Sequence, residues 1–284
     1  MHKPVLKEEV IKFLEVGANE HFVDCTAGGG GHSRAILERS APGGKVLAME
    51  WDKDLFSKLK DEERIIAVNE SYVALEETVK EKEFGPVHGV LFDLGFSSYH
   101  IEESGRGFSF MKDEPLDMRY NTDTLLTAEE IVNTYDEDRI AEIITKWGEE
   151  EYAKKIAKKI VLRREDRPIK KTTQLVKIIE ESVPNVKRNI HCATKTFQAL
   201  RIAVNGEILN LREGLRQSLN VLHTGGRLVV ISFHGIEDEE VVKFFRENEN
   251  SLEMVTQRAI TPTENEVDEN IRSRSAKLRA AIKK

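Results

Sequence analysis

Three acidic residues that could accept hydrogen bonds at one site follow short apolar segments: Asp24, Glu50 and Asp93. A carboxylate accepts several hydrogen bonds at once, from a cationic amino group or from the two hydroxyl groups of a ribose. Apolar runs such as 87–93 are typical of strands that are buried on both faces of a parallel sheet. Because ligands of such sheets bind beyond the carboxyl ends of the strands, the three residues predict one crevice for a nucleotide-like ligand.

The first of these acids lies in a glycine-rich stretch, residues 22–33, with the sequence FVDCTAGGGGHS. This pattern predicts a strand, a tight turn and a helix start, as in the first βα unit of nucleotide-binding folds. The dinucleotide pattern G-x-G-x-x-G fails at Ser33, whereas D-x-x-x-G-x-G, from Asp24, is the first motif of S-adenosylmethionine (SAM) methyltransferases. The stretch therefore favours SAM, with Asp24 accepting from its amino group, and a purely structural glycine turn is the alternative.

Two further residues are candidate contacts of the same ligand. Glu50 ends an apolar segment about 20 residues after the glycines, where an acid receives the ribose hydroxyls in such folds. Asp52 is the second choice for this role, and a helix N-terminal acid is the alternative interpretation of Glu50. Tyr72 follows the segment 64–69 and is suited to stacking on an adenine or to packing as a buried aromatic residue at a helix start.

A sheet of alternating strands and helices is needed to position these residues. A first helix is expected at 4–14, and residues 194–222 have the periodicity of one long amphipathic helix. We predict an α/β fold class, a SAM-dependent methyltransferase Rossmann-like sheet with an inserted all-helical subdomain. Strands are expected at 22–25, 45–50, 64–69, 87–95 and 227–233, with a closing antiparallel pair at 252–260 and 275–284.

The alternation of strands and helices stops in the middle of the chain, where only helices are expected. The expected helices are 127–135, 138–165 and 172–183, with Thr127 and Thr172 as N-caps. The predicted domains are therefore a SAM-binding methyltransferase domain (1–105 and 194–284) and an inserted helical subdomain (106–193).

Positive charge is concentrated in two segments, although the protein as a whole is acidic. The chain has 284 residues and a formal net charge of −7, which argues mildly against a nucleic-acid partner. Residues 153–171 nevertheless hold nine Lys and Arg against two acids, and residues 272–284 hold six without an acid. Such segments can bind RNA phosphates, and a solvated helix face is the alternative interpretation.

The composition argues against several other classes of protein. No apolar run approaches the ~20 residues of a membrane span, and the N-terminus does not have the pattern of a signal peptide. Cys25 and Cys192 are far apart and in no metal-ligand spacing. We therefore expect no metal, no membrane partner, two free thiols and a reducing, cytoplasmic setting, with Cys25 in the core.

Eight motifs occur along the chain in the following order: DCTAGGGGHSRAIL, GVLFDLGFSS, RGFSF, EPLDMR, GEEEYAKKIAKKI, ATKTFQALRIAVN, GGRLVVISFH and RSRSAKLRAA. Together they resemble the bacterial 16S ribosomal RNA cytosine-N4 methyltransferase family, over about residues 2–281. The resemblance implies a SAM-binding Rossmann domain and an inserted helical domain, here 106–193, that helps to hold the RNA. By position it implies SAM contacts at Gly30, Gly31, His32, Glu50, Tyr72, Asp93 and His100.

The chain departs from the family pattern at several positions. The family usually has Asp where Glu50 stands, Phe where Tyr72 stands and Gln where His100 stands. It has Ser-Leu-Glu-Asp-Arg where this chain has Gly-Ile-Glu-Asp-Glu, at residues 235–239. The missing serine and arginine are expected to weaken RNA or active-site contacts, and they leave a non-catalytic module that binds SAM or RNA as one alternative function.

The implied reaction is methyl transfer from SAM to the exocyclic N4 of one cytidine in the decoding region of 16S rRNA. Asp93 is the candidate acceptor for the amine hydrogens, or only a SAM contact, and Asp117 and His234 are weaker candidates. A Rossmann enzyme with a nicotinamide cofactor is the second alternative, disfavoured by Asp24 and by the missing third glycine.

The implied partner is 16S rRNA, free or within the small ribosomal subunit, and both a monomer and a homodimer remain open. The target base must leave any stack to reach a buried methyl donor. Phe96, Phe108 and Phe110 are available for stacking on it, and a place in the core or in a lid is the alternative for all three.

Overall fold

Two compact units make up the protein, whose computed structural model describes residues 4–59, 62–184 and 190–284. The sheet unit comprises Met1–Gly95 and Ile208–Lys284, and the helical unit comprises Phe96–Glu207. The helical unit extends beyond 106–193 at both ends, and helix α10 (Thr194–Asn205) contributes to its core. No helix in the described ranges is long and apolar enough to cross a lipid bilayer.

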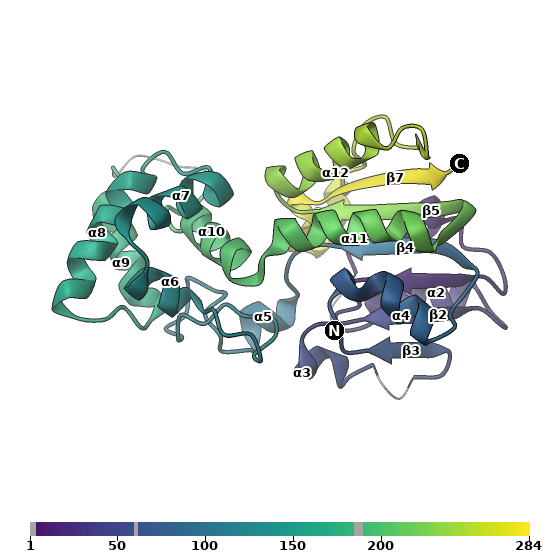
Figure 1. Ribbon diagram of the computed structural model, residues 1–284, viewed down its shortest axis with the longest axis horizontal. Helices are drawn as coiled ribbons and strands as arrows, with labels where there is room; N and C mark the ends of the chain where they lie inside the picture. The colour runs from purple at the N-terminus through teal and green to yellow at the C-terminus, as the bar shows by residue number, and fades with distance from the viewer. Residues whose placement is uncertain (1–3, 60–61, 185–189) are drawn as a thin grey trace. The chain divides into compact units, whose positions relative to one another are not determined.

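The sheet unit is built on seven strands in the order β3-β2-β1-β4-β5-β7-β6 (Figure 1). Strands β1 to β5 pair in parallel, whereas β7 runs antiparallel to β5, and β6 runs antiparallel to β7. This topology confirms the predicted α/β Rossmann-like sheet with its closing antiparallel pair. The strands are β1 (His21–Asp24), β2 (Lys45–Met49), β3 (Ile65–Val68), β4 (Val87–Asp93), β5 (Leu222–Ser232), β6 (Leu252–Met254) and β7 (Lys277–Lys283).

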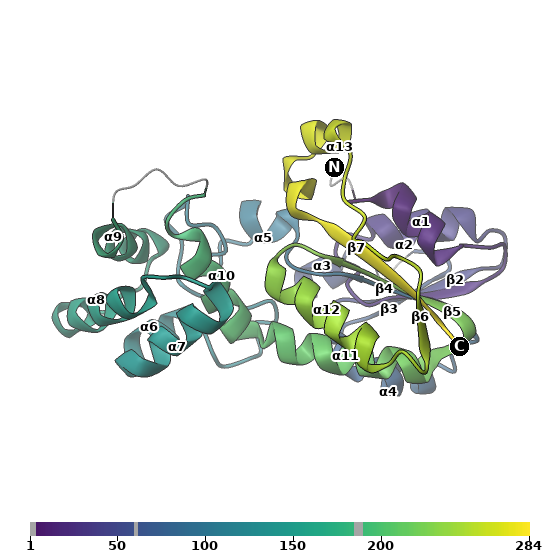
Figure 2. The same cartoon turned by 90° about the horizontal axis from the view of Figure 1, so that it is seen from above.

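Helices cover both faces of this sheet, as Figure 2 shows. Helices α1 (Lys7–Leu14) and α2 (Gly31–Arg39) lie on one face. Helices α4 (Leu75–Glu81), α11 (Glu207–Val221) and α12 (Gly235–Glu247) lie on the other. The central strands are therefore buried on both sides, which explains their nearly continuous apolar sequences. The short elements of this unit are α3 (Lys53–Phe56), η1 (Tyr72–Ala74), α13 (Glu264–Glu269) and η2 (Ile271–Ser275).

Strand β5 begins earlier than the expected segment 227–233. Val87 of β4 pairs with Leu222, and Gly89 pairs with Arg227, so the β5 residues between these partners bulge out of the ladder. Gly225 within the bulge has a φ of 84°, a conformation that glycine adopts without strain. The residues just before the expected segment therefore form an irregularity inside β5.

The helical unit has its own apolar core. Leu116, Ile144, Ile156, Ile179 and Leu200 are fully buried there and come from a loop and four helices. The unit therefore packs like an independent small domain around residues of helical periodicity. Its helices are α5 (Ser98–Glu102), α6 (Ala128–Thr134), α7 (Glu137–Gly148), α8 (Ala153–Asp166), α9 (Thr172–Ser182) and α10.

Two segments that were each predicted as one continuous helix form two helices in the structure, so these predictions were wrong. The segment 138–165 is divided into α7 and α8, because Glu149 takes a left-handed conformation with φ 52° after α7. The segment 194–222 is divided into α10 and α11 at Gly206, which has φ 62°. Left-handed residues end helices by satisfying the last carbonyl groups, a signal that hydrophobic periodicity does not contain.

The two predicted N-caps had different outcomes. The Thr127 side chain accepts a hydrogen bond from the backbone N–H of Glu130 and caps α6, as predicted. Thr172 is not a cap, because it is the first residue inside α9. Its hydroxyl donates to the Lys112 carbonyl and accepts from the Glu114 N–H, so it ties α9 to the loop before α6.

Candidate active site

The carboxyl ends of β1, β2 and β4 lie side by side at one edge of the sheet. Asp24 ends β1 and pairs in register with Ala48 of β2 and Leu91 of β4. Glu50 follows β2 directly, and Asp93 is the last residue of β4. The structure thus brings together the three acids that were predicted to converge, at the edge where ligands of parallel sheets bind.

The glycine turn between β1 and α2 lies at the same edge. Gly28 and Gly30 have φ angles of 54° and 82°, which residues with a side chain adopt only with strain. A Cβ atom at Gly30 would lie 2.6 Å from Leu59 Cδ2, whereas a Cβ atom at Gly29 would meet no described atom within 4 Å. The backbone is therefore bare at Gly29, where a ligand can approach it closely.

Glu50 is held by the glycine turn and by its own following residues. Its Oε2 accepts from the Gly28 N–H at 2.7 Å, and its Oε1 accepts from the Asp52 N–H at 2.7 Å. Burial raises the pKa of Glu50 to about 7, and the nearby Asp52 and Asp24 add to this effect. Asp52 itself caps α3 by accepting from the Asp54 N–H, so the role of helix N-terminal acid falls to Asp52 and not to Glu50.

Asp24 lies beneath the turn and is only 1% exposed. Its Oδ2 accepts from the Ser33 hydroxyl at 2.6 Å, and its Oδ1 accepts from the Thr26 N–H at 3.2 Å. Burial raises its pKa, and the hydrogen bond from Ser33 acts in the opposite direction. Asp24 therefore joins the end of β1 to the first turn of α2, a structural task that the sequence pattern did not predict.

The two carboxylate oxygens of Asp93 have different surroundings. Its backbone N–H donates to Thr26 Oγ1 at 2.6 Å, and its Oδ2 lies 3.4 Å from His32 Nε2. Its buried Oδ1 has no hydrogen-bond partner among the described residues. Burial lowers the pKa of His32, but the carboxylates of Asp93, Asp24 and Glu266 outweigh burial and raise it above the ordinary value.

Tyr72 starts η1 just after β3 and is half-buried. Its ring lies edge-on to Phe92 of β4, with centroids 5.4 Å apart and an interplanar angle of 77°. A Cβ atom at Gly214 of α11 would lie 2.7 Å from Tyr72 Cδ2, so a glycine is needed beside the ring. These contacts hold the aromatic ring in a fixed position near the ends of the strands.

The seventh predicted SAM contact, His100, belongs to the helical unit. Its side chain accepts from the Ser97 N–H at 3.0 Å through Nδ1, which caps α5. It is 4% exposed and packs against Phe108 and Tyr120, with ring centroids 4.9 and 5.0 Å away. Within its own unit His100 is a buried residue of an aromatic cluster.

The three phenylalanines differ in exposure. Phe108 is 8% exposed and stacks on Tyr120, and Phe110 packs against His191 and Phe197. Phe96 is 37% exposed, and the Arg201 guanidinium lies 4.7 Å from its ring centroid. Among the three, Phe96 presents the most accessible ring.

The two weaker acid–base candidates have structural partners. Asp117 accepts two hydrogen bonds from the Arg119 guanidinium, at 2.8 and 2.7 Å. His234 caps α12, where its Nδ1 accepts from the Glu237 N–H and its Nε2 lies 3.2 Å from Glu237 Oε1. Neither arrangement requires a catalytic role.

The two basic segments have different structures. Residues 153–171 form α8 and the following loop, where Glu181 pairs with Lys159 and Arg163. Lys154 and Lys158 are exposed and have no acidic partner in the described part of the chain. Residues 272–284 include β7, whose cations are engaged, since Lys277 and Arg279 bind Asp238 and Lys283 binds two carbonyl groups. Lys154 and Lys158 of the first segment are therefore exposed cations that could meet phosphates, whereas the cations of β7 are engaged.

The two cysteines are free thiols, as expected. Burial raises the pKa of Cys25 well above its ordinary value, so this core thiol is unreactive.

Cys192 lies close to Glu180 and His191, with potential ligand atoms within 4.8 Å of one another. His191 Nδ1 accepts from the Ala193 N–H, which leaves the proton on Nε2, the nitrogen that faces Glu180. We therefore assign no metal to this cluster.

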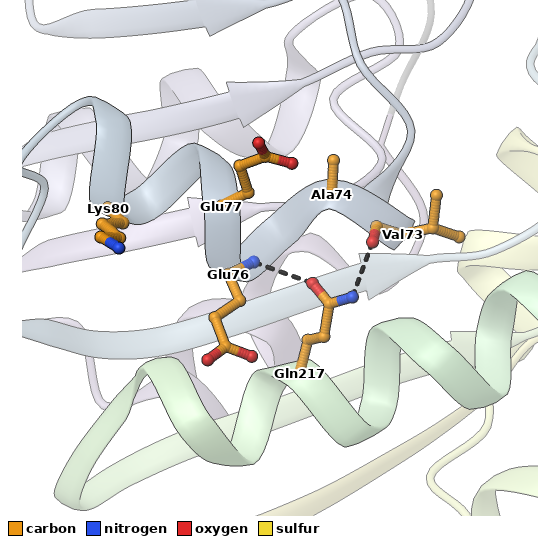
Figure 3. Close-up of a pocket in the computed structure, with 6 residues that line it drawn as sticks. All are labelled: Val73, Ala74, Glu76, Glu77, Lys80 and Gln217. Atoms are coloured by element: carbon orange, nitrogen blue, oxygen red, sulfur yellow. Dashed lines mark hydrogen bonds between the residues drawn. The ribbon is translucent and has the colours of Figure 1, made fainter.

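A surface hollow of about 340 Å³ lies between η1, α4 and α11 (Figure 3). Gln217 spans it by accepting from the Glu76 N–H and donating to the Val73 carbonyl. Its lining includes none of the three acids at the sheet edge. We therefore place the candidate active site at the carboxyl ends of β1, β2 and β4.

A sequence model of the MraW methylase family matches residues 1–284. Three relatives bear the name "Ribosomal RNA small subunit methyltransferase H". The relative from Thermotoga neapolitana is 44% identical over 290 residues, which are 99% of this chain and 95% of that protein. Those from Dictyoglomus thermophilum and Dehalococcoides mccartyi are 43% and 41% identical, over 98% and 99% of this chain and 95% and 86% of theirs.

The solved structures that match the chain have low sequence identity. A SAM-dependent O-methyltransferase from Thermotoga maritima is 10% identical, with a TM-score of 0.44 over 100% of this chain and 67% of that chain. A fibrillarin from Aeropyrum pernix, in complex with natively bound S-adenosyl-L-methionine, is 8% identical, with a TM-score of 0.42 over 94% and 68%.

Proposed function

The chain belongs to the MraW methylase family, and we propose that it methylates the exocyclic N4 of a cytidine in the decoding region of 16S rRNA. Without regard to the methylated position, it is a SAM-dependent methyltransferase of small-subunit rRNA. The eight motifs and the arrangement around Asp93 support the N4 position. The rRNA substrate also supports the expected cytoplasmic location.

The residues at the sheet edge fit SAM as the cofactor. Glu50 uses one acceptor position on each oxygen for the backbone, so both oxygens can still accept from ribose hydroxyls. The fixed ring of Tyr72 is suited to the adenine, and the turn from Gly30 to His32 is suited to the methionine part. When bound, SAM supplies an electrophilic methyl group. The nicotinamide alternative is set aside, because the family is a methylase family.

The observation that carries the proposal is the Asp93 carboxylate at the tip of β4, whose Oδ1 has no partner among the described residues and whose side chain is 19% exposed. The exocyclic amine of cytosine is a weak nucleophile, because its lone pair is delocalised into the ring. An acceptor for the amine hydrogens favours the pyramidal nitrogen and orients it toward the methyl donor. Such positioning contributes about 7–11 kcal/mol in well-oriented reactions. Asp93 provides this acceptor in our proposal.

The RNA would be held by the helical unit. The exposed ring of Phe96, backed by Arg201, offers a stacking surface for an unpaired base of the RNA. Lys154 and Lys158 on α8 are free to bind phosphates. We propose the helical unit as the RNA-recognition part of the enzyme.

The unusual segment 235–239 does not favour a non-catalytic module. It forms the first turn of α12, where Glu237 accepts from the Phe233 N–H at 2.8 Å. Asp238 accepts from Arg279 of β7. The segment therefore stabilises the connection after β5 with the residues that it has.

Asp93→Asn tests the proposal, because the variant keeps the size of the side chain and removes the charge. We expect turnover with unmodified small subunits to fall about 10²–10⁴-fold. We also expect SAM affinity, measured by equilibrium dialysis, to stay near the wild-type value. Asp138→Asn, at an exposed position on α7, is the matched control and should leave both values unchanged. Loss of SAM binding in Asp93→Asn would instead assign Asp93 to the cofactor.

A further inference from the structure

His32 is a buried histidine whose ring has no hydrogen bond to any described residue. It is 5% exposed, and both Nδ1 and Nε2 lack partners. Buried polar groups without partners are rare and cost about 1–3 kcal/mol each, so such a group calls for an explanation. A carboxylate oxygen lies close to this ring: Asp93 Oδ2 is 3.4 Å from His32 Nε2.

We propose that His32 is the positioning residue of Asp93: its Nε2–H donates to Asp93 Oδ2 and thereby fixes the orientation of the carboxylate that accepts from the amine of the substrate. This inference rests on the proposed function, in which Asp93 accepts the amine hydrogens. The contact is long and poorly aligned in the unliganded protein, as catalytic hydrogen bonds often are before substrate binds. We expect it to shorten when the site is filled.

The backbone on both sides of this contact is already fixed. The Asp93 N–H donates to Thr26 Oγ1 at 2.6 Å, which holds the end of β4 against the turn. Ser33, next to His32, donates to the buried Asp24 at 2.6 Å, which holds the first turn of α2. The rotation of the Asp93 carboxylate is the remaining freedom, and His32 is placed to restrict it.

The electrostatic surroundings keep the donor in place. The carboxylates that face His32 come from three elements: Asp93 from β4, Asp24 from β1 and Glu266 from α13. They favour a protonated imidazole, whereas burial and the N-terminus of α2 disfavour it. The Nε2–H is present in the cation and in one neutral tautomer, so donation to Asp93 does not depend on which of these two forms predominates.

Two substitutions separate positioning from packing. His32→Gln keeps an N–H donor near the position of Nε2, whereas His32→Leu removes the donor and keeps an apolar volume. At saturating SAM, we expect turnover to fall about 10- to 100-fold in His32→Leu and to stay within about threefold of wild type in His32→Gln. His223→Gln, at a histidine in β5 where the ladder bulges, is the control with no expected effect. Equal losses in both His32 variants, or loss of SAM binding alone, would overturn the proposal.

A second measurement needs no turnover. Nuclear magnetic resonance of ¹⁵N-histidine protein reports the His32 tautomer and pKa, with His32→Gln identifying its signal among eight histidines. We expect an Nε2–H signal in the wild type and a lower His32 pKa in Asp93→Asn, because burial then acts with less opposition. An unchanged His32 pKa in Asp93→Asn would overturn the pairing. Failure of N4 methylation with an intact His32–Asp93 coupling would instead contradict the proposed function.

Discussion

The backbone N–H of Gly28 donates a 2.7 Å hydrogen bond to Oε2 of Glu50. This bond joins the turn after β1 to the acid after β2, two segments that the sequence separates. The other oxygen of Glu50 accepts from the Asp52 N–H, so one carboxylate organises both loops. A ligand that binds the turn therefore meets Glu50 in a fixed position.

Glu50 should make the stability of the unliganded protein depend on pH. Its folded pKa of about 7 lies above the ordinary value of 4.5, so the folded state holds its proton more tightly. The resulting stabilisation is complete below pH 4.5 and is lost as the pH rises through about 7, by at most about 3 kcal/mol. Urea unfolding between pH 4.5 and 8 should show this decline in the wild type and a smaller one in Glu50→Gln. An identical pH dependence in both proteins would contradict the assignment, and Glu77→Gln, at an exposed position on α4, is the control.

The two central glycines of the turn should respond differently to substitution. Gly30→Ala combines a φ of 82° with a clash against Leu59, so we expect a loss of about 1–3 kcal/mol in unfolding free energy. Gly29→Ala meets no described atom within 4 Å and should change stability by less than about 0.5 kcal/mol. Urea denaturation of both variants measures the difference. Equal losses would show that the turn is not built as described.

The free lysines of α8 should contribute to RNA binding in a salt-dependent way. Each phosphate contact adds about 0.7–0.9 to the slope of log affinity against log salt concentration. The double variant Lys154→Ala/Lys158→Ala should therefore bind 16S rRNA more weakly, with a slope smaller by up to about 1.8. Lys243→Ala, on α12 near Glu247, is the matched control for the loss of an exposed lysine. An unchanged slope would remove α8 from the RNA interface.

Phe96 should contribute to substrate binding through its ring. Base stacking on an aromatic residue contributes about 1–3 kcal/mol, so Phe96→Leu should raise KM for rRNA about 5- to 100-fold. Phe96→Trp keeps an aromatic surface and should retain most of the wild-type affinity. Steady-state kinetics at saturating SAM measure both variants. Equal KM values for Leu and Trp would show that the ring does not stack on a base.

The positions of the strands and of the acids at their ends could be predicted from the sequence, because buried parallel strands are continuous apolar runs and the acids follow them directly. Asp24, Glu50 and Asp93 converge for this reason. The helix break at Glu149 could not be predicted, because it depends on one left-handed backbone conformation.

The hydrogen bonds and ion pairs around the site could also not be predicted from local sequence patterns. The hydrogen bond from Ser33 that occupies Asp24 and the contact between His32 and Asp93 join residues from different elements. Lys277, Arg279 and Lys283 bind Asp238 or nearby carbonyl groups, so a count of charges overestimated how many C-terminal cations are available. Pairing of this kind requires the folded structure.

The identity of the methylated nucleoside tests the central claim most directly. Small ribosomal subunits that lack the modification are incubated with the protein and with SAM carrying a deuterated methyl group. The 16S rRNA is then cut into fragments, digested to nucleosides and analysed by mass spectrometry against methylcytidine standards. We predict labelled N4-methylcytidine, confined to the fragment that contains the decoding region. Label in C5-methylcytidine or in a ribose methyl group, or no label with folded protein that binds SAM, would contradict the account.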